Sequence, residues 1–438
     1  MVETDFIQII IGVGILLFAA KIMAELFLRL KLPIVLGELL AGMIVGPFAL
    51  GSLLVFNGDP LLTISSEIRV LGEIGAIVIL FIAGLEMTPR EFIRGGKASG
   101  VVGTFGVVIP FFAGLMIFQM FGFDALQSMM IATALTATSI AISVQVLSEF
   151  GKMKTPEARL IIGAAVIDDI LAIAILSVVS SLATGEGGID QLDITEVTIT
   201  ILKVLGFFAV MLIVAVVAMP RIVTPRLWKA KGSIEGIATA SFFGAAALAG
   251  LMGLSPIVGA FAVGMALSTS KVLDKIEHYA SRIGLIFAPL FFAIIGAQVD
   301  FRAVNLEILT LSGIIIVIAV VTKYFGCGLP AWLFLKNKRQ GMRVGIGMIS
   351  RGEVGLIVAG VGISSGVLTS DVYSTIVLMV IATTIITPIW MKIEYRKEQK
   401  GDSSAQKDDS DNDNSDDVHE SKIDQKLSKI LDVLGVEK

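Results

Sequence analysis

The sequence has 438 residues, of which 55% are hydrophobic and only 16% charged, with a mean hydropathy of +0.88. Soluble globular chains carry about 25% charged residues, so this composition excludes an ordinary soluble protein and predicts a polytopic membrane protein. The formal net charge is only −4, and we expect no nucleic-acid partner. The single cysteine, Cys327, excludes an internal disulfide.

Thirteen apolar stretches are long enough to cross a bilayer. They lie near residues 6–28, 33–55, 67–87, 97–120, 126–150, 159–183, 196–219, 233–253, 255–270, 281–299, 307–335, 342–367 and 371–392. One set of alternate loops holds nineteen Lys and Arg residues, whereas the other set holds only Arg69 and Arg302. The positive-inside rule places the basic loops in the cytoplasm. The sequence therefore predicts an all-α protein of about thirteen helices, with its N-terminus outside and its C-terminus inside.

Two distant parts of the sequence match each other at a constant offset. VILFIAGLEMTPREF at 78–92 resembles PLFFAIIGAQVDFRA at 289–303 in its order of apolar residues, glycine and polar exit, and the offset of 212 residues that relates Gly84 to Gly296 also relates Thr138 to Ser350. Transporters are often built from inverted repeats. Because the span at 67–87 leads inward and the span at 281–299 leads outward, we expect two halves of opposite orientation.

Two of the spans have an interior that suits a broken helix. The stretch ATALTATSIAISVQ at 132–145 concentrates hydroxyl groups, including those of Thr138 and Ser139. The stretch GIGMISRGEVG at 345–355 places glycines, Arg351 and Glu353 at membrane depth. Hydroxyls can also bond to their own helix, and glycines can serve close packing. The correspondence between the two halves favours broken helices, which expose carbonyls and helix ends near the bilayer midplane.

Two adjacent aspartates, Asp168 and Asp169, interrupt the apolar run AAVIDDILAIA at 164–174. A charge at the centre of a span costs roughly 2.5–3.5 kcal/mol, so such residues usually mark a functional site. Adjacent helical residues point about 100° apart. One aspartate can therefore face the broken helices while the other pairs with a buried cation such as Lys323. The remaining deep charges are Glu38, Glu73, Arg351 and Glu353.

This cluster predicts an exchange chemistry. Interacting carboxylates titrate as one coupled unit, and such a unit can hold protons or a small monovalent cation but not both in full. Competition of this kind, combined with alternating access, is sufficient to exchange a cation for protons. The alternative is a static ion-pair network that only holds helices together. No metal-ligand cluster or nucleophile arrangement predicts an enzyme, and we expect no cofactor beyond the transported ions.

Six ordered segments resemble the monovalent cation:proton antiporter-two family, and within it the NapA-type sodium/proton antiporters. They are LPIVLGELLAGMIVGP (32–47), LGEIGAIVILFIAGLEM (71–87), TATSIAISV (136–144), IDD (167–169), TKYFGCGLPA (322–331) and SRGEVGLIVAGVG (350–362). The resemblance covers roughly residues 5–392. It implies an NhaA/NapA-like fold with two crossing broken helices, and a homodimer in the cell (plasma) membrane. It also implies an elevator motion of a core domain (67–183 and 281–392) against a dimerisation domain (6–55 and 196–270).

The resemblance further implies individual roles. Asp169 matches the ion-binding aspartate and Asp168 its partner, while Lys323 matches the lysine that pairs with this partner when protons occupy the site. Thr138 falls at the unwound part of its span, and Ser139 replaces an aspartate of the NhaA-type antiporters. A sodium site formed by Asp169, Asp168 and Thr138 follows. This combination favours electrogenic exchange of sodium or lithium for protons in pH homeostasis. The expected supporting charges are Arg351, Glu353 and Glu73.

Two other transport functions stay open at this point. A potassium/proton antiporter or a Kef-like potassium efflux system would use related motifs, because sequence discriminates sodium from potassium poorly. A sodium-coupled organic-anion symporter is disfavoured, since carboxylates dominate the expected site. After an antiporter domain at 1–395, the acidic composition of 396–420 predicts a disordered linker, and 421–438 has the apolar stripe of a short amphipathic helix. This tail is expected in the cytoplasm.

Overall fold

The computed structural model describes residues 2–52, 55–56, 59–60, 62–183, 194–299 and 306–397. The predicted linker at 396–420 and terminal helix at 421–438 therefore lie almost entirely outside the described residues. By its contacts the chain divides into a unit over Met1–Ile389 and a second over Trp390–Lys438.

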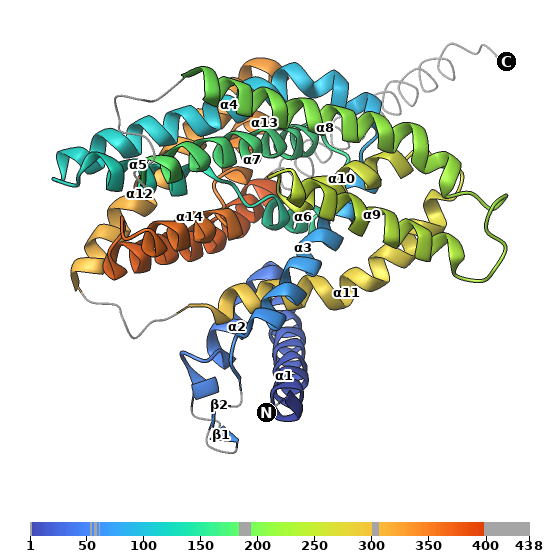
Figure 1. Ribbon diagram of the computed structural model, residues 1–438, viewed down its shortest axis with the longest axis horizontal. Helices are drawn as coiled ribbons and strands as arrows, with labels where there is room; N and C mark the ends of the chain where they lie inside the picture. The colour runs from blue at the N-terminus through green and yellow to red at the C-terminus, as the bar shows by residue number, and fades with distance from the viewer. Residues whose placement is uncertain are drawn as a thin grey trace, which may run out of the picture. The chain divides into compact units, whose positions relative to one another are not determined.

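The described part of this unit is helical apart from one short antiparallel strand pair (Figure 1). The pair consists of β1 (Val55–Phe56) and β2 (Asp59–Pro60), with Val55 opposite Pro60. The helices are α1 (Val2–Arg29), α2 (Ile34–Val45), η1 (Leu50–Ser52), α3 (Ser66–Leu85), α4 (Pro89–Met120), α5 (Ala125–Thr136), α6 (Ile140–Glu149), α7 (Pro156–Ala183), α8 (Ile194–Ile222), α9 (Ser233–Leu251), α10 (Pro256–Leu267), α11 (Leu273–Ala297), α12 (Leu306–Leu335), α13 (Lys338–Gly347) and α14 (Glu353–Ser364). A last helix, without a label, follows at Ser370–Lys397.

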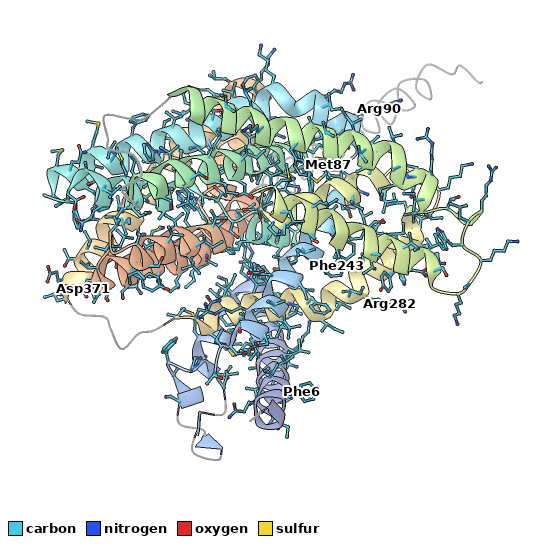
Figure 2. All side chains as sticks on the ribbon, in the orientation of Figure 1. Phe6, Met87, Arg90, Phe243, Arg282 and Asp371 are labelled. Carbon is cyan, nitrogen blue, oxygen red and sulfur yellow. The ribbon has the colours of Figure 1, made fainter. Side chains whose placement is uncertain are left out.

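Eleven helices of the described residues are long and apolar enough to cross a membrane, which confirms a polytopic membrane protein. Large apolar side chains on their outer faces support this assignment, because lipid is the solvent that such a surface suits. Phe6 on α1, for example, is 62% exposed (Figure 2). The predicted number of thirteen helices and the orientation of the termini stay predictions.

Three predicted spans differ in length from the helices observed. The predicted span at 255–270 is the 12-residue helix α10, and the span at 342–367 is divided into α13 and α14. The predicted span at 33–55 corresponds to the candidate span Ile34–Ser52, within which α2 ends at Val45. Pro47 disfavours a helical conformation at the residue before it, and Gly46 is accordingly extended, with φ −63° and ψ 167°.

The helices pack as two groups. We call α1, α2, α3, α9, α10 and α11 the first group and α4, α5, α7, α12, α13 and α14 the second, because each set packs mainly within itself. The half-length helix α6 contacts α2 and α3 as well as α7, and α8 contacts α7 as well as α10. Glycines allow close approach within the first group. A side chain at Gly42 would meet the carbonyl of Ala293, and one at Gly84 would meet that of Phe261.

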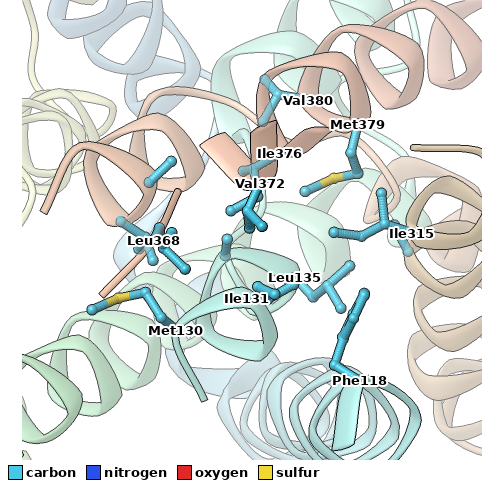
Figure 3. Packing of buried hydrophobic residues seen from close by; sticks show 14 of the residues in the cluster. Phe118, Met130, Ile131, Leu135, Ile315, Leu368, Val372, Ile376, Met379 and Val380 are labelled. Atoms are coloured by element: carbon cyan, nitrogen blue, oxygen red, sulfur yellow. The ribbon is translucent and has the colours of Figure 1, made fainter. Parts of the chain in front are cut away.

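A buried apolar cluster holds the second group together (Figure 3). It joins Phe118 of α4, Leu135 of α5 and Ile315 of α12 to Val372 and Ile376 of the last helix. Phe118, Leu135, Ile315 and Ile376 have no exposed surface. Because interiors of this kind are close-packed and resist deformation, the cluster fixes α5 at the position where its C-terminal end reaches the site described next.

Candidate functional site

The two interrupted helices meet at their breaks. Helix α5 ends at Thr136 and α6 begins at Ile140, while α13 ends at Gly347 and α14 begins at Glu353. The Ser139 amide donates to the Ser350 carbonyl at 2.9 Å, and the Ser350 hydroxyl donates to the Ser139 carbonyl at 3.2 Å. The two predicted helix breaks are therefore confirmed. The segments related by the offset of 212 residues lie against each other at a crossing.

Side-chain hydroxyls hold this crossing from both helices. The Thr138 hydroxyl donates to the Met348 carbonyl at 3.3 Å. The Ser143 hydroxyl donates to the Gly347 carbonyl and lies 3.3 Å from the Ser350 hydroxyl. A broken helix leaves carbonyl groups without intrahelical partners, and these hydroxyls bind some of them. The crossing is consequently a fixed polar structure in an apolar surrounding.

Gly352 has no room for a side chain at the crossing. A Cβ atom there would lie 2.6 Å from the Ser139 Cβ and 2.6 Å from its hydroxyl oxygen. Real Cβ atoms essentially never come so close to other atoms. Glycine at this position therefore allows the two breaks to touch.

Helix α7 buries both predicted aspartates, with Asp168 0% and Asp169 1% exposed. The Lys323 Nζ lies 2.7 Å from the Asp168 Oδ1, and neither side chain has exposed surface. Thr138 and Arg351 are close enough to Asp168 to interact with it. The structure thus brings together Asp168, Lys323, Thr138 and Arg351 beside Asp169. Taking such ions out of water costs several kcal/mol each, and their attraction offsets this cost only where the geometry is good.

Arg351 is a fixed cation inside the crossing. Its side chain is fully buried, and its Nη1 donates to the Ile349 carbonyl at 2.9 Å and to the Met348 carbonyl at 3.2 Å. The last helix holds its backbone, because the Arg351 amide donates to the Thr383 hydroxyl at 3.2 Å and the Thr384 hydroxyl donates to the Arg351 carbonyl at 2.9 Å. The guanidinium therefore occupies carbonyls that the helix break exposes, and its charge stays at the site.

Sequence reasoning missed four residues that shape the site. Thr383 and Thr384 lie in an apolar span, where hydroxyl residues commonly bond to their own helix, so nothing in the sequence marked them. Gly106 of α4 faces the ion pair, since a Cβ atom there would lie 2.7 Å from the Cys327 Sγ and 3.4 Å from the Lys323 Nζ. In the sequence, Cys327 stands out only as the single cysteine, which excludes an internal disulfide. It lies on the same face of α12 as Lys323, four residues further on.

One predicted supporting charge lies away from the crossing, and the side chain of another is outside the described part of the structure. Glu73 lies on α3 with an exposed side chain, so it belongs to the surface of the first group. The backbone of Glu353 begins α14, but its side chain lies outside the described part of the structure. Ser139, by contrast, is 1% exposed and forms part of the crossing. Over the described ranges, no three His, Cys, Asp or Glu side chains are placed to hold a metal ion together.

Comparison with known proteins identifies the family of this chain. The family model described as sodium/hydrogen exchanger, transmembrane, matches residues 14–393. The chain belongs to this exchanger family. As an exchanger it is a multi-pass membrane antiporter acting on cations and protons, and not an enzyme.

Two similar exchangers cover nearly the whole chain. The Na(+)/H(+)-K(+) antiporter GerN of Bacillus cereus is 35% identical over 392 residues, which are 89% of this chain and 96% of the relative. The high-affinity Na(+)/H(+) antiporter NhaS3 of Synechocystis sp. is 33% identical over 431 residues, covering 90% of this chain and 91% of the relative.

A solved exchanger structure has the same fold. The sodium proton antiporter MjNhaP1 of Methanocaldococcus jannaschii superposes with a TM-score of 0.65 and 19% sequence identity, over 88% of this chain and 96% of the other. Similarity at this level of identity supports the fold alone.

Proposed function

We propose that this exchanger moves sodium or lithium against protons by alternating access, with the cation bound at Asp169 and with Asp168 and Thr138 as further oxygen ligands. The observation that carries the proposal is the buried Lys323–Asp168 pair beside Asp169 at the helix crossing. A carboxylate pair in an apolar region requires a partner for each charge. Lys323 pairs with Asp168, and we assign the proton or the transported cation to Asp169.

The proposed cycle uses these residues in two states. In the proton-loaded state Asp169 carries a proton and Lys323 pairs with Asp168. When the cation binds, Asp169 releases its proton, Asp168 turns toward the cation, and Lys323, which has lost its partner, releases a proton as well. Exchange then moves net charge. Arg351 stays bound to backbone carbonyls throughout, so it sets the local potential without leaving the site.

Alternating access requires the crossing to move relative to a stationary part. The helix packing favours the second group as the moving core, because this group contains Asp168, Asp169 and Lys323. It also contains α5, α13 and α14, three of the four helices that border the breaks. Helices α3 and α11 pack within the first group, so we assign them to the dimerisation domain. This assignment differs from the boundaries at 67 and 281 that the sequence suggested. A homodimer formed by the first group, with the tail in the cytoplasm of the cell, completes the proposal.

Potassium is a second candidate cation. The name of the relative GerN includes potassium beside sodium, and the described site contains no feature that excludes the larger ion. The organic-anion symporter gains no comparable support, since the similar exchangers are antiporters.

A reconstitution experiment tests cation and charge together. The purified protein is placed in liposomes that contain a pH dye, and pulses of sodium, lithium and potassium are compared with the voltage free or clamped. We expect sodium and lithium to drive proton movement, faster with the voltage clamped because exchange is electrogenic. If only potassium drove proton movement, the transported cation would be potassium and not sodium. A rate that does not depend on the voltage clamp would exclude a cycle that releases two protons for each cation.

A further inference from the structure

Helix α2 is capped by a residue from a distant helix. Its own N-cap residue, Pro33, makes no side-chain capping bond. Instead, the amide of Ile34 donates to the Glu149 Oε2 at 2.9 Å, and the amide of Val35 donates to the Glu149 Oε1 at 3.1 Å. A carboxylate at a helix N-terminus is stabilised by the free amides and by the helix dipole. Glu149 is the last residue of α6, so this contact docks the end of α6 on α2.

A second carboxylate lies one turn further along α2. Glu38 is 3% exposed, and its Oε2 is buried without a hydrogen-bond partner among the described residues. The charges that act on it are Lys21 of α1, which has an exposed side chain, and Glu149. The ion-exchange cycle proposed above uses none of these three residues.

Few charged side chains lie near Glu38 on α11 or on the turns that adjoin α2 and α6. Helix α11 packs on α2 along Ala293 and Gly296, and its segment from Gly284 to Ala297 contains no titratable residue. The neighbouring turns contain Lys31, just before α2, and Lys152, just after α6. Lys152 lies three residues after Glu149 in the sequence, whereas Lys31 lies seven residues before Glu38 and has an exposed side chain.

Two ionised carboxylates at this contact would oppose docking. Glu149 is stabilised as an anion by the α2 amides, whereas Glu38 would carry a buried charge with one oxygen unbonded beside a like charge. A proton on Glu38 removes the repulsion and the cost of the buried charge. When α6 leaves α2, water reaches Glu38 and the proton can depart.

We propose that Glu38 is a second proton-binding site, separate from the helix crossing, and that its proton holds α6 docked on α2. Helix α6 begins directly after Ser139 of the crossing, so docking restrains the helix that follows Thr138, one of the proposed cation ligands. This inference rests on the proposed function for its role in transport. In the proposed orientation the contact faces the cytoplasm.

The sign of the pH effect follows from the number of bound protons. The docked state binds one more proton than the undocked state, so docking weakens as the pH on this side rises. For a single proton, the ratio of docked to undocked molecules changes by at most about tenfold per pH unit. High cytoplasmic pH therefore releases α6 and speeds transport.

Cysteine labelling tests this inference without requiring transport. The native Cys327 is fully buried, so a Val35→Cys substitution, whose side chain is 1% exposed in the docked state, supplies the reporter. Inside-out vesicles without sodium are treated with an impermeant maleimide at pH 6 to 9. We expect labelling to accelerate several-fold with pH in the reporter protein, to stay slow at every pH after Glu38→Gln, and to be fast at every pH after Glu149→Ala.

Two further variants sharpen the test. Glu38→Asp keeps a titrating carboxyl and should keep the pH dependence, while Glu67→Gln, an exposed residue of α3, should label like the reporter protein. Labelling of Glu38→Gln that follows the same pH curve as the reporter protein would overturn the proposal. The liposome assay is independent of this result: a pH-dependent contact without sodium-driven proton movement would reject the transport function and keep the proton site.

Discussion

Lys323 and Asp168 carry opposite charges into a region where neither side chain meets solvent. The adjacent aspartates and the lysine could be predicted from the sequence, because charges inside apolar spans are conspicuous. The residues that surround the Lys323–Asp168 pair could not be predicted in this way. Gly106 and Cys327 complete the packing around Lys323, but a glycine and a cysteine in apolar helices resemble ordinary packing residues, and only the fold shows what they face.

Removing Lys323 should show how much the ion pair with Asp168 contributes to stability. In Lys323→Ala, Asp168 keeps a buried charge without its partner, which typically costs 3–5 kcal/mol. We expect a lower melting temperature and a changed pH profile of transport. The double variant Lys323→Met/Asp168→Asn removes both charges and should melt closer to the unmodified protein. Equal melting of the single variant and the unmodified protein, with an unaltered pH profile, would show that the pair has no such role.

Gly106 provides a steric test of the same pair. A methyl group there would meet the Cys327 Sγ at 2.7 Å, so Gly106→Ala should displace α12 and reduce transport at least about tenfold, the effect of a barrier change near 1.4 kcal/mol. Gly100→Ala is the matched control, since a side chain at Gly100 of the same helix meets no atom within 4 Å. Similar transport rates for the two variants would contradict the close packing.

Among the elements, the broken helices were predictable and some helix ends were not. Clustered hydroxyls at 132–145 and glycines beside Arg351 marked both breaks, because these residues tolerate or replace lost helical hydrogen bonds. The ends of α2 and the short length of α10 depend on local chemistry. Gly46 and Pro47 stop α2 inside a stretch that hydropathy alone extends to residue 55.

The contact between the two breaks can be tested at Gly352. Its replacement by Ala would push against Ser139, and overpacking of this kind typically costs 1–3 kcal/mol. We expect reduced thermal stability and slower exchange. Gly360→Ala, in α14, is the control, because a Cβ atom there would meet no neighbouring residue within 4 Å. This variant should leave the thermal stability and the exchange rate unchanged. If Gly352→Ala matches this control in melting temperature and in transport rate, the breaks do not need to touch.

For the whole molecule, hydropathy predicted a polytopic membrane protein, and the charges inside its spans together with the family resemblance predicted an antiporter. The family membership agrees. The division into helix groups could not be predicted, because α3 and α11 are as apolar as the helices of the second group. Glycines determine which helices α3 and α11 pack against. Gly42 of α2 allows close approach to Ala293 of α11, and Gly84 of α3 allows close approach to Phe261 of α10. These contacts are visible only in the folded structure.

The proposed release of α6 from α2 of the first group predicts that joining these two helices stops transport. Cysteines introduced together as Ile34→Cys and Glu149→Cys lie across the α2–α6 contact, whose backbone amide and carboxylate are 2.9 Å apart. Joining them with a short cleavable thiol cross-linker should abolish exchange, and reduction should restore it. Each single-cysteine variant, treated identically, should be unaffected by the reagent. Continued exchange in the fully cross-linked protein would show that transport does not require relative motion at this contact.

The central claim is that Asp169 binds both the cation and the proton. Its most direct test is sodium uptake and internal pH measured together in liposomes containing Asp169→Asn, with the melting temperature confirming a folded protein. The account predicts that both sodium uptake and sodium-driven proton movement are lost, because the neutral amide can release no proton and binds the cation weakly. Exchange at the rate of the unmodified protein would contradict it.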